Sequence, residues 1–143
     1  MAARHWFFAS NPSTYHWDTL FVKGKELWRG ARSVAAQRYL KQVQKGDHIV
    51  CFHGAPERRV YALATVASNP YLDPHDENGR LYAVDLKAFQ RIQRAITFKD
   101  LKTARLLRKM RFLARPRLAV SPLSEIEYND ILRMAGMVVS AHR

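Results

Sequence analysis

Residues 47–68, "DHIVCFHGAPERRVYALATVAS", contain two β-rich segments, 47–54 and 59–68, separated by the short connection "APER". β-Branched and aromatic residues are typical of strands, and a loop of about four residues joins antiparallel neighbours. The stretch therefore predicts a β-hairpin. Further strands are predicted in "RHWFFAS" (4–10), "RLYAVDLKAF" (80–89) and "RLAVSPL" (117–123).

Helices are predicted between these strands. Ser13 or Thr14 is a plausible cap for a short helix through Leu20. Residues 32–43 have apolar positions at helical spacing and end at Lys45-Gly46, and residues 97–114 form a second helical stretch. The terminal helix has Ser124 as its cap and Glu127 as the capping-box partner, with apolar contacts expected from the following set: Ile126, Ile131, Leu132.

These elements predict an α+β fold, a small sheet or barrel with helices packed on its outside. No repeat, low-complexity tract or flexible linker divides the sequence, so we expect residues 1–143 to form one domain.

The composition points to a polyanionic partner. The 143 residues include 24 Lys and Arg against 12 Asp and Glu, a formal charge of +12. Between Arg91 and Arg117 there are ten basic residues and one acidic residue, Asp100. Such a field attracts nucleic acid, and a solvated face that serves solubility is the alternative interpretation.

A cytoplasmic location is expected. Cys51 is the single cysteine, so it can form neither an internal disulfide nor a cysteine zinc site, and it lies in an apolar run that suggests burial. The N-terminal run "HWFFA" is too short for a signal-peptide core, and no apolar stretch approaches membrane-spanning length.

Enzyme signatures are weak. The segment "DPHDE" (73–77) groups potential metal ligands, but its polar turn composition favours a solvated loop. A Cys51–His53 pair would share a strand face, yet Cys51 is expected to be an inert core thiol. Nucleotide-binding, nucleophile-elbow and zinc-protease motifs are absent from the sequence, and we expect no catalytic residue, metal or cofactor.

Aromatic and small polar residues gather at predicted strand ends and turns. Trp28 stands beside Gly30 and a basic helix, where we expect its ring to face solvent and charge rather than the core. A flat base needs a flat wall to stack on and a few directed donors and acceptors.

The ordered set "HWFFASNP" (5–12), "WRGARSVAAQRYL" (28–40), "KGDHIVCFHG" (45–54), "NPYLDP" (69–74) and "MRFLARPRLAVSPLSEIEYNDILRMAG" (110–136) resembles the EVE domain of the PUA-like superfamily over nearly the whole chain. The resemblance implies a PUA-like β pseudo-barrel with flanking α-helices, related in shape to YTH domains. It also implies a binding module that holds a modified base in a pocket between barrel and helices.

Four residues depart from the family pattern, namely Ala9, Asn11, Ser33 and Gln37. The family commonly has Lys-Ser-Glu-Pro where this chain has Ala9-Ser10-Asn11-Pro12. Asn11 can both donate and accept where a glutamate only accepts, so the recognised base edge can differ from that of relatives.

We therefore expect Trp28 to wall the pocket, with Gly30 permitting close backbone approach. The full expected base pocket is Ser10, Asn11, Trp28, Arg32, Ser33, Phe52 and His53. The residues expected to bind phosphates are Arg29, Arg38, Lys41, Arg108 and Arg117.

The leading hypothesis is a non-enzymatic module that binds RNA or DNA carrying a modified base. An unpaired target is easier to bind, because extruding a base from a duplex costs a few kcal/mol. The alternative is a sequence-independent RNA-binding or ribosome-associated accessory protein. A third hypothesis is a small hydrolase or nuclease that uses the "DPHDE" loop and His53.

Overall fold

The computed structural model describes residues 3–137, and within them seven strands form one mixed sheet. The strands are β1 (His5–Ser10), β2 (Lys25–Trp28), β3 (His48–His53), β4 (Arg59–Val66), β5 (Tyr71–Leu72), β6 (Tyr82–Thr97) and β7 (Val120–Leu123). The order along the sheet is β2-β6-β4-β3-β1-β7, with β5 paired to β6. The sheet is not closed, because β2 and β7 end this path.

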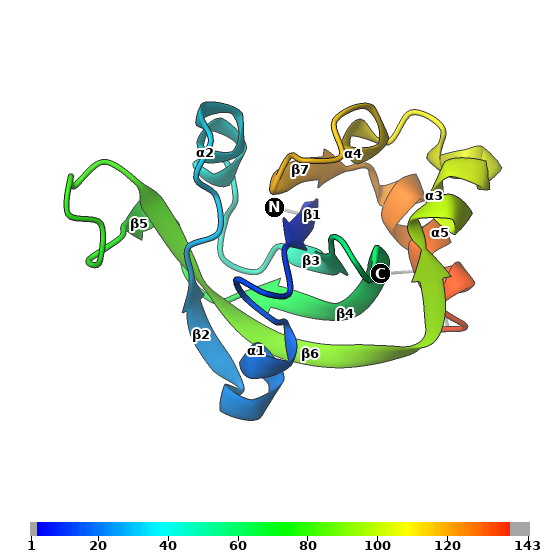
Figure 1. Cartoon of the computed structure of the whole chain (residues 1–143), viewed down its shortest axis with the longest axis horizontal. Coiled ribbons are helices and arrows are strands. Elements are labelled where there is room, and N and C mark those ends of the chain that lie inside the picture. Colours follow the sequence, from blue (N-terminus) through cyan, green and yellow to red (C-terminus); the bar gives the residue numbers. More distant parts are fainter. Residues whose placement is uncertain (1–2, 138–143) are drawn as a thin grey trace.

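The strands pair in both directions. β1 runs parallel to β3 and antiparallel to β7, and the other pairs are antiparallel. The register between β4 and β6 shifts between Val60 and Ala62 and again between Leu63 and Ala64. Such irregularities bend a strand and increase its twist. Figure 1 shows the result, a strongly curved β6 that passes along β4 and turns up towards the helices that follow it.

Helices cover the two ends of this curved sheet. They are α1 (Asp18–Lys23), α2 (Val34–Leu40), α3 (Phe98–Thr103), the 3-10 helix η1 (Arg105–Leu107), α4 (Arg111–Ala114) and α5 (Glu125–Met134). Figure 1 shows α3 and α5 together where β6 finishes, and α2 on the other side of β1. No helix among the described residues is long and apolar enough to cross a membrane.

The sheet separates two hydrophobic clusters, which explains the unbroken apolar run of β1. Trp6 and Phe8 belong to one cluster, and Phe7 belongs to the other. Successive side chains of a strand point to opposite faces, so a strand covered on both faces is apolar at every position.

Several sequence predictions are confirmed. The 47–68 hairpin forms as β3 and β4, the strands predicted in 4–10 and 117–123 form as β1 and β7, and α2 lies inside 32–43. The N-cap of α5 is Ser124, which accepts from the Glu127 backbone N–H while the Glu127 carboxylate accepts from the Ser124 N–H. The α+β class is confirmed.

Other predictions are wrong in their bounds. Neither Ser13 nor Thr14 caps α1, which begins at Asp18 after Trp17. β6 continues through residues 90–97, and the helix expected over 97–114 is broken into α3, η1 and α4. β2 and β5 were not predicted, and Ile126 is exposed rather than packed against the core.

Candidate nucleic-acid interface

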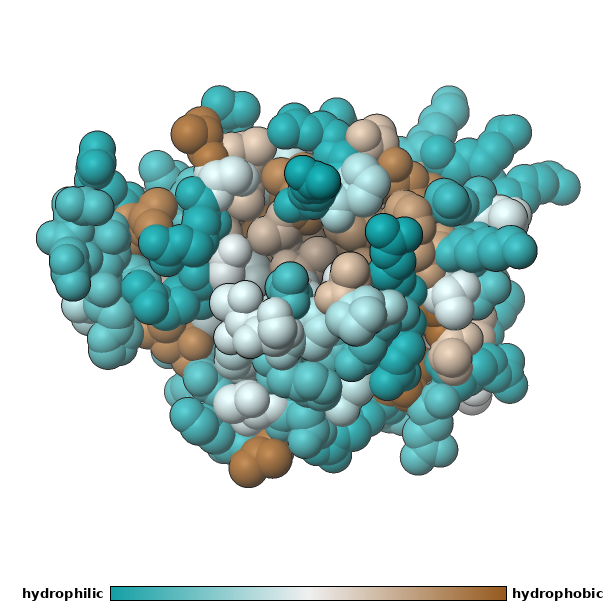
Figure 2. All heavy atoms as spheres, in the orientation of Figure 1, coloured by the Kyte–Doolittle hydropathy of each residue, from teal (hydrophilic) through white to brown (hydrophobic). Residues whose placement is uncertain are grey.

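A cavity of about 920 Å³ opens where β1 ends, a size within the usual range of ligand sites. Its lining is Ala9, Ser10 and Asn11 at the end of β1, Ser33 before α2, Phe52, Gly54, Ala55 and Arg58 around the β3–β4 turn, Phe98, Phe112, and residues 114–118. Figure 2 shows hydrophobic residues between hydrophilic ones on one face of the molecule.

Backbone hydrogen bonds join the walls of the cavity. The Gly54 N–H donates to the Ser10 carbonyl at 2.9 Å, which ties the β3–β4 turn to the end of β1. The Phe98 N–H donates to the Arg58 carbonyl at 2.9 Å, and the Ala9 N–H donates to the Ala119 carbonyl at 2.9 Å. These bonds place segments far apart in sequence around one cavity.

Three phenylalanines form the aromatic part of the lining. Phe112 lies 5.1 Å from Phe52 and 6.1 Å from Phe98 between ring centroids, both in edge-to-face arrangements. Phe52 and Phe112 are buried, whereas Phe98 is only partly buried. Phe98 is therefore the least buried aromatic ring of the lining, and the Lys102 ammonium lies over this ring, 5.1 Å from its centre. Phe98 was not predicted as a site residue, because the Thr97/Asp100 capping box and the apolar spacing around it indicate a helix start and not a ligand site.

Three exposed arginines also line the cavity, namely Arg58, Arg115 and Arg117. Among residues 3–137, none of the ion pairs involves any of the three. No acidic residue lines the cavity in this part of the chain. The lining therefore attracts anions such as phosphate. Of these arginines, only Arg117 was predicted as a phosphate ligand.

The cavity brings together four of the seven residues expected to form a base pocket, which are Ser10, Asn11, Ser33 and Phe52. Trp28, Arg32 and His53 are not in its lining. Arg32 is exposed outside it. Ala9 lines the cavity, whereas Gln37 is buried and bonds to Ala31 and Tyr82 backbone atoms.

The expectation that Trp28 faces solvent is wrong. Its side chain is 2% exposed and belongs to the core. Its ring stacks on Phe8 at 4.5 Å and on Trp17 at 5.9 Å, and Gly30 packs against it so closely that an added Cβ would lie 2.5 Å from the indole. Gly30 does permit close backbone approach, but the surface approached is Trp28 itself. The indole Nε1 is buried without a hydrogen-bond partner among the described residues.

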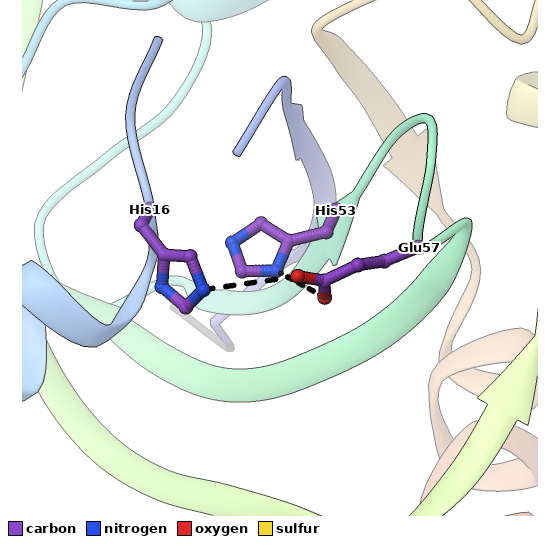
Figure 3. A group of neighbouring side chains, drawn as sticks. All are labelled: His16, His53 and Glu57. Carbon is purple, nitrogen blue, oxygen red and sulfur yellow. Dashed lines mark hydrogen bonds and ion pairs between the residues drawn. The ribbon is translucent and has the colours of Figure 1, made fainter. Parts of the chain in front are cut away.

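His53 is fully buried behind the cavity and takes part in a cluster with Glu57, to which it is hydrogen-bonded, and His16, whose Nε2 lies 3.8 Å from the Glu57 carboxylate (Figure 3). The Trp17 backbone N–H donates to Nε2 of His53 at 2.9 Å, so the neutral ring carries its proton on Nδ1, which lies 3.1 Å from Glu57 Oε1. Burial lowers the pKa of His53, and the Glu57 hydrogen bond opposes this shift.

The same cluster is the one group of three or more potential metal ligands that lie together within residues 3–137, but its hydrogen bonds do not suit a metal. A metal-bound histidine needs an acceptor for its other ring N–H. In this cluster the ring nitrogens that point away from Glu57 face donors instead: the Trp17 N–H donates to His53 Nε2, and the Asp18 N–H donates to His16 Nδ1. The cluster instead ties the segment after β1 to the β3–β4 turn and so positions two walls of the cavity.

The "DPHDE" loop does not assemble a catalytic site with His53. Asp73 is buried, and Arg29 Nε lies 2.6 Å from its Oδ2. Burial raises the pKa of Asp73, but the hydrogen bonds from Arg29 and the His75 N–H outweigh burial and leave it lowered. Asp76 accepts from the backbone N–H groups of Leu81 and Arg80, which lower its pKa. Cys51 is buried, which raises its thiol pKa.

The predicted phosphate ligands are spread over the surface. Arg38 and Lys41 are exposed on and after α2, and the Lys41 ammonium lies 5.0 Å from the Tyr82 ring centre. Arg108 is exposed outside the cavity lining. Arg29 is already paired with Asp73, so its charge is offset within the fold.

Comparisons with known proteins agree with this architecture. The family model of the EVE domain matches residues 4–134. Thymocyte nuclear protein 1 of Gallus gallus is 23% identical in an alignment 131 positions long, which covers 76% of this chain and 54% of that protein. The chain thus spans about half the length of this curated relative.

Solved structures share the fold. A protein of Rhodopseudomonas palustris has a TM-score of 0.87 at 26% identity, over 99% of both chains. Human THYN1 in complex with DNA containing 5-methylcytosine has a TM-score of 0.82 at 20% identity, over 96% of this chain and 100% of that chain. The YTH domain of Zygosaccharomyces rouxii MRB1, in complex with N6-methyladenosine RNA, has a TM-score of 0.60 at 17% identity, over 100% and 95%. The PUA-like fold and its relation to YTH domains are confirmed, and the chain belongs to the EVE-domain family.

Proposed function

We propose that this chain is a non-enzymatic nucleic-acid-binding module that holds one modified base of an unpaired strand in the cavity at the end of β1. The observation that carries this proposal is the lining itself, which contains a partly exposed aromatic ring, Phe98, and three arginines but no carboxylate among the described residues. Aromatic rings stack on bases, and arginines pair with phosphates.

The geometry favours an unpaired target. A base held inside a cavity must leave its stack, and this costs least where the strand is already single. The arginines at the cavity then meet the phosphates on either side of the inserted base. Two fold relatives support a modified base, because human THYN1 was solved with 5-methylcytosine DNA and the yeast YTH domain with N6-methyladenosine RNA.

The test measures affinity for short single strands that differ only in one methylated base, at a single salt concentration. Tighter binding of the methylated strand is expected. Phe98→Leu keeps an apolar side chain but removes the aromatic face, so it should weaken binding by about 1–3 kcal/mol, the value of one stacked base.

Phe89→Leu is the matched control, because Phe89 is 64% exposed on β6 and outside the cavity lining. It should leave affinity unchanged, and thermal unfolding should show that both variants are folded. Equal affinity of the wild type for methylated and plain strands would contradict the proposal and favour the sequence-independent accessory protein. Unchanged affinity of a folded Phe98→Leu variant would show that Phe98 is not the stacking ring.

A further inference from the structure

The polar side chains that line the cavity are mainly hydrogen-bond donors. Arg58, Arg115 and Arg117 can only donate, and neither an acidic residue nor a histidine lines the cavity within residues 3–137. The neutral polar side chains of the lining are Ser10, Asn11 and Ser33, and their free donors and acceptors determine which base edge the cavity can hydrogen-bond.

Asn11 has its amide nitrogen left to offer. The backbone N–H of Ser13 lies 2.9 Å from the Asn11 side chain and can only donate, so the atom that it meets must be Oδ1. The Ser13 hydroxyl donates to the same oxygen at 2.7 Å. This turn satisfies the acceptor of Asn11, and the two N–H groups on Nδ2 remain for a ligand.

Ser33 is also left as a donor, whereas Ser10 is not. The Ser33 Oγ accepts from the Ala36 N–H at 3.0 Å, so its own O–H remains free to turn towards a ligand. The Ser10 O–H donates to the Tyr15 carbonyl at 2.7 Å, which leaves one neutral hydroxyl oxygen as an acceptor. Hydrogen-bond donors therefore outnumber acceptors among the neutral side chains of the lining, as they do among its charged side chains.

We propose that the cavity selects a modified pyrimidine with a carbonyl at ring position 4 over one with an amine there, an inference that rests on the function proposed above. Uracil-type bases present the acceptor O4, whereas cytosine-type bases present the donor N4–H₂, which needs an acceptor such as a carboxylate. Asn11 is the specificity-determining residue in this proposal. Its Nδ2 donates a hydrogen bond to O4 of a uracil-type base, whereas opposite N4–H₂ of a cytosine-type base two donors would meet and no hydrogen bond could form.

The experiment uses four short RNA strands that are identical except at one position, which holds cytidine, 5-methylcytidine, uridine or 5-methyluridine. The two methylated bases share the methyl group and differ at ring positions 3 and 4: 5-methylcytosine has the acceptor N3 and the donor N4–H₂, whereas 5-methyluracil has the donor N3–H and the acceptor O4. The wild type should bind the 5-methyluridine strand about tenfold more tightly than the 5-methylcytidine strand.

Asn11→Asp replaces the donating nitrogen with an accepting oxygen in nearly the same shape and keeps the oxygen that Ser13 binds. This variant should reduce the preference for 5-methyluridine by about tenfold. Asn78→Asp, the same change at an exposed residue outside the cavity lining, should leave the preference unchanged. Unchanged thermal unfolding confirms that the variants are folded.

The two proposals fail differently. A wild-type preference for 5-methylcytidine, or an unchanged preference in Asn11→Asp, would overturn the assignment of the base edge while the methyl dependence stands. Equal binding of methylated and plain strands in both pairs would instead overturn the modified-base function.

Discussion

The backbone N–H of Trp17 donates to Nε2 of His53 at 2.9 Å, which fixes the proton of the neutral imidazole on the nitrogen that faces Glu57. Protonation of Nε2 would turn this acceptor into a second donor and break the bond. Because this bond holds Trp17, the position of the loop after β1 depends on a neutral His53 ring.

Stability should therefore fall in mild acid. The pKa of His53 lies below its ordinary value of 6.5 in the folded protein, chiefly because the side chain is buried. The unfolded chain then binds more protons between the folded pKa and about 6.5, so the free energy of unfolding decreases as pH falls through this window. An NMR titration of the His53 ring checks the cause, and a midpoint above 6.5 would contradict it.

Gly30→Ala should destabilise the fold by about 1–3 kcal/mol, the usual cost of overpacking. The new Cβ would lie 2.5 Å from the Trp28 ring, which is held between Phe8 and Trp17 and cannot move away. Gly54→Ala is the control, because its Cβ would meet its nearest neighbour at 3.9 Å. Urea denaturation of the two variants measures the difference, and equal midpoints would refute the close contact.

Trp6→Phe should cost more stability than Trp28→Phe. Both changes remove the same volume from one core cluster. The Trp6 Nε1 donates to the Asp47 carboxylate at 2.9 Å, whereas the Trp28 Nε1 has no partner among the described residues. A buried hydrogen bond to a charged group is worth about 1.5–3 kcal/mol, which is the expected difference in the free energy of unfolding. A larger loss in the free energy of unfolding for Trp28→Phe than for Trp6→Phe would contradict this expectation.

Arg29→Gln should affect folding rather than nucleic-acid binding. The buried Asp73 carboxylate would lose the guanidinium that neutralises it, at a cost of about 1–3 kcal/mol. Because this charge is already paired, the salt dependence of binding should stay as in the wild type. A shallower salt slope in a stable Arg29→Gln variant would restore Arg29 as a phosphate ligand.

The sequence predicted those elements that are stabilised by contacts between residues close together in the chain. The cap of α5 needs only Ser124 and Glu127, and the β3–β4 hairpin needs only its short turn. The continuation of β6 depends instead on pairing of Ile96 with Val60, which composition near residue 96 does not announce. Residues 90–96 were therefore assigned to no element, although they continue the strand predicted over 80–89.

The candidate site shows the same division between local and distant contacts. Trp28 has surface-like neighbours in sequence, but Phe8 and Trp17 arrive from distant positions and bury it. The end of β1 could be predicted as a cavity wall from its small polar residues. Phe98 reaches the cavity because its N–H bonds to the Arg58 carbonyl of the β3–β4 turn, and Arg115 reaches it because it follows α4, which packs against β7.

The exposed charges beyond the cavity can be tested by the salt dependence of binding. Arg38 and Lys41 lie next to each other at the end of α2, whereas Lys25 and Lys87 are paired across β2 and β6, at least three strands away from β1. If α2 contacts the strand that enters the cavity, the double change Arg38→Gln and Lys41→Gln should reduce the slope of log affinity against log salt by about 0.7 for each phosphate that is no longer neutralised. Lys25→Gln with Lys87→Gln removes the same charge and should leave the slope unchanged. Equal reductions in both pairs would mean that net charge, and not a defined path over α2, attracts the nucleic acid.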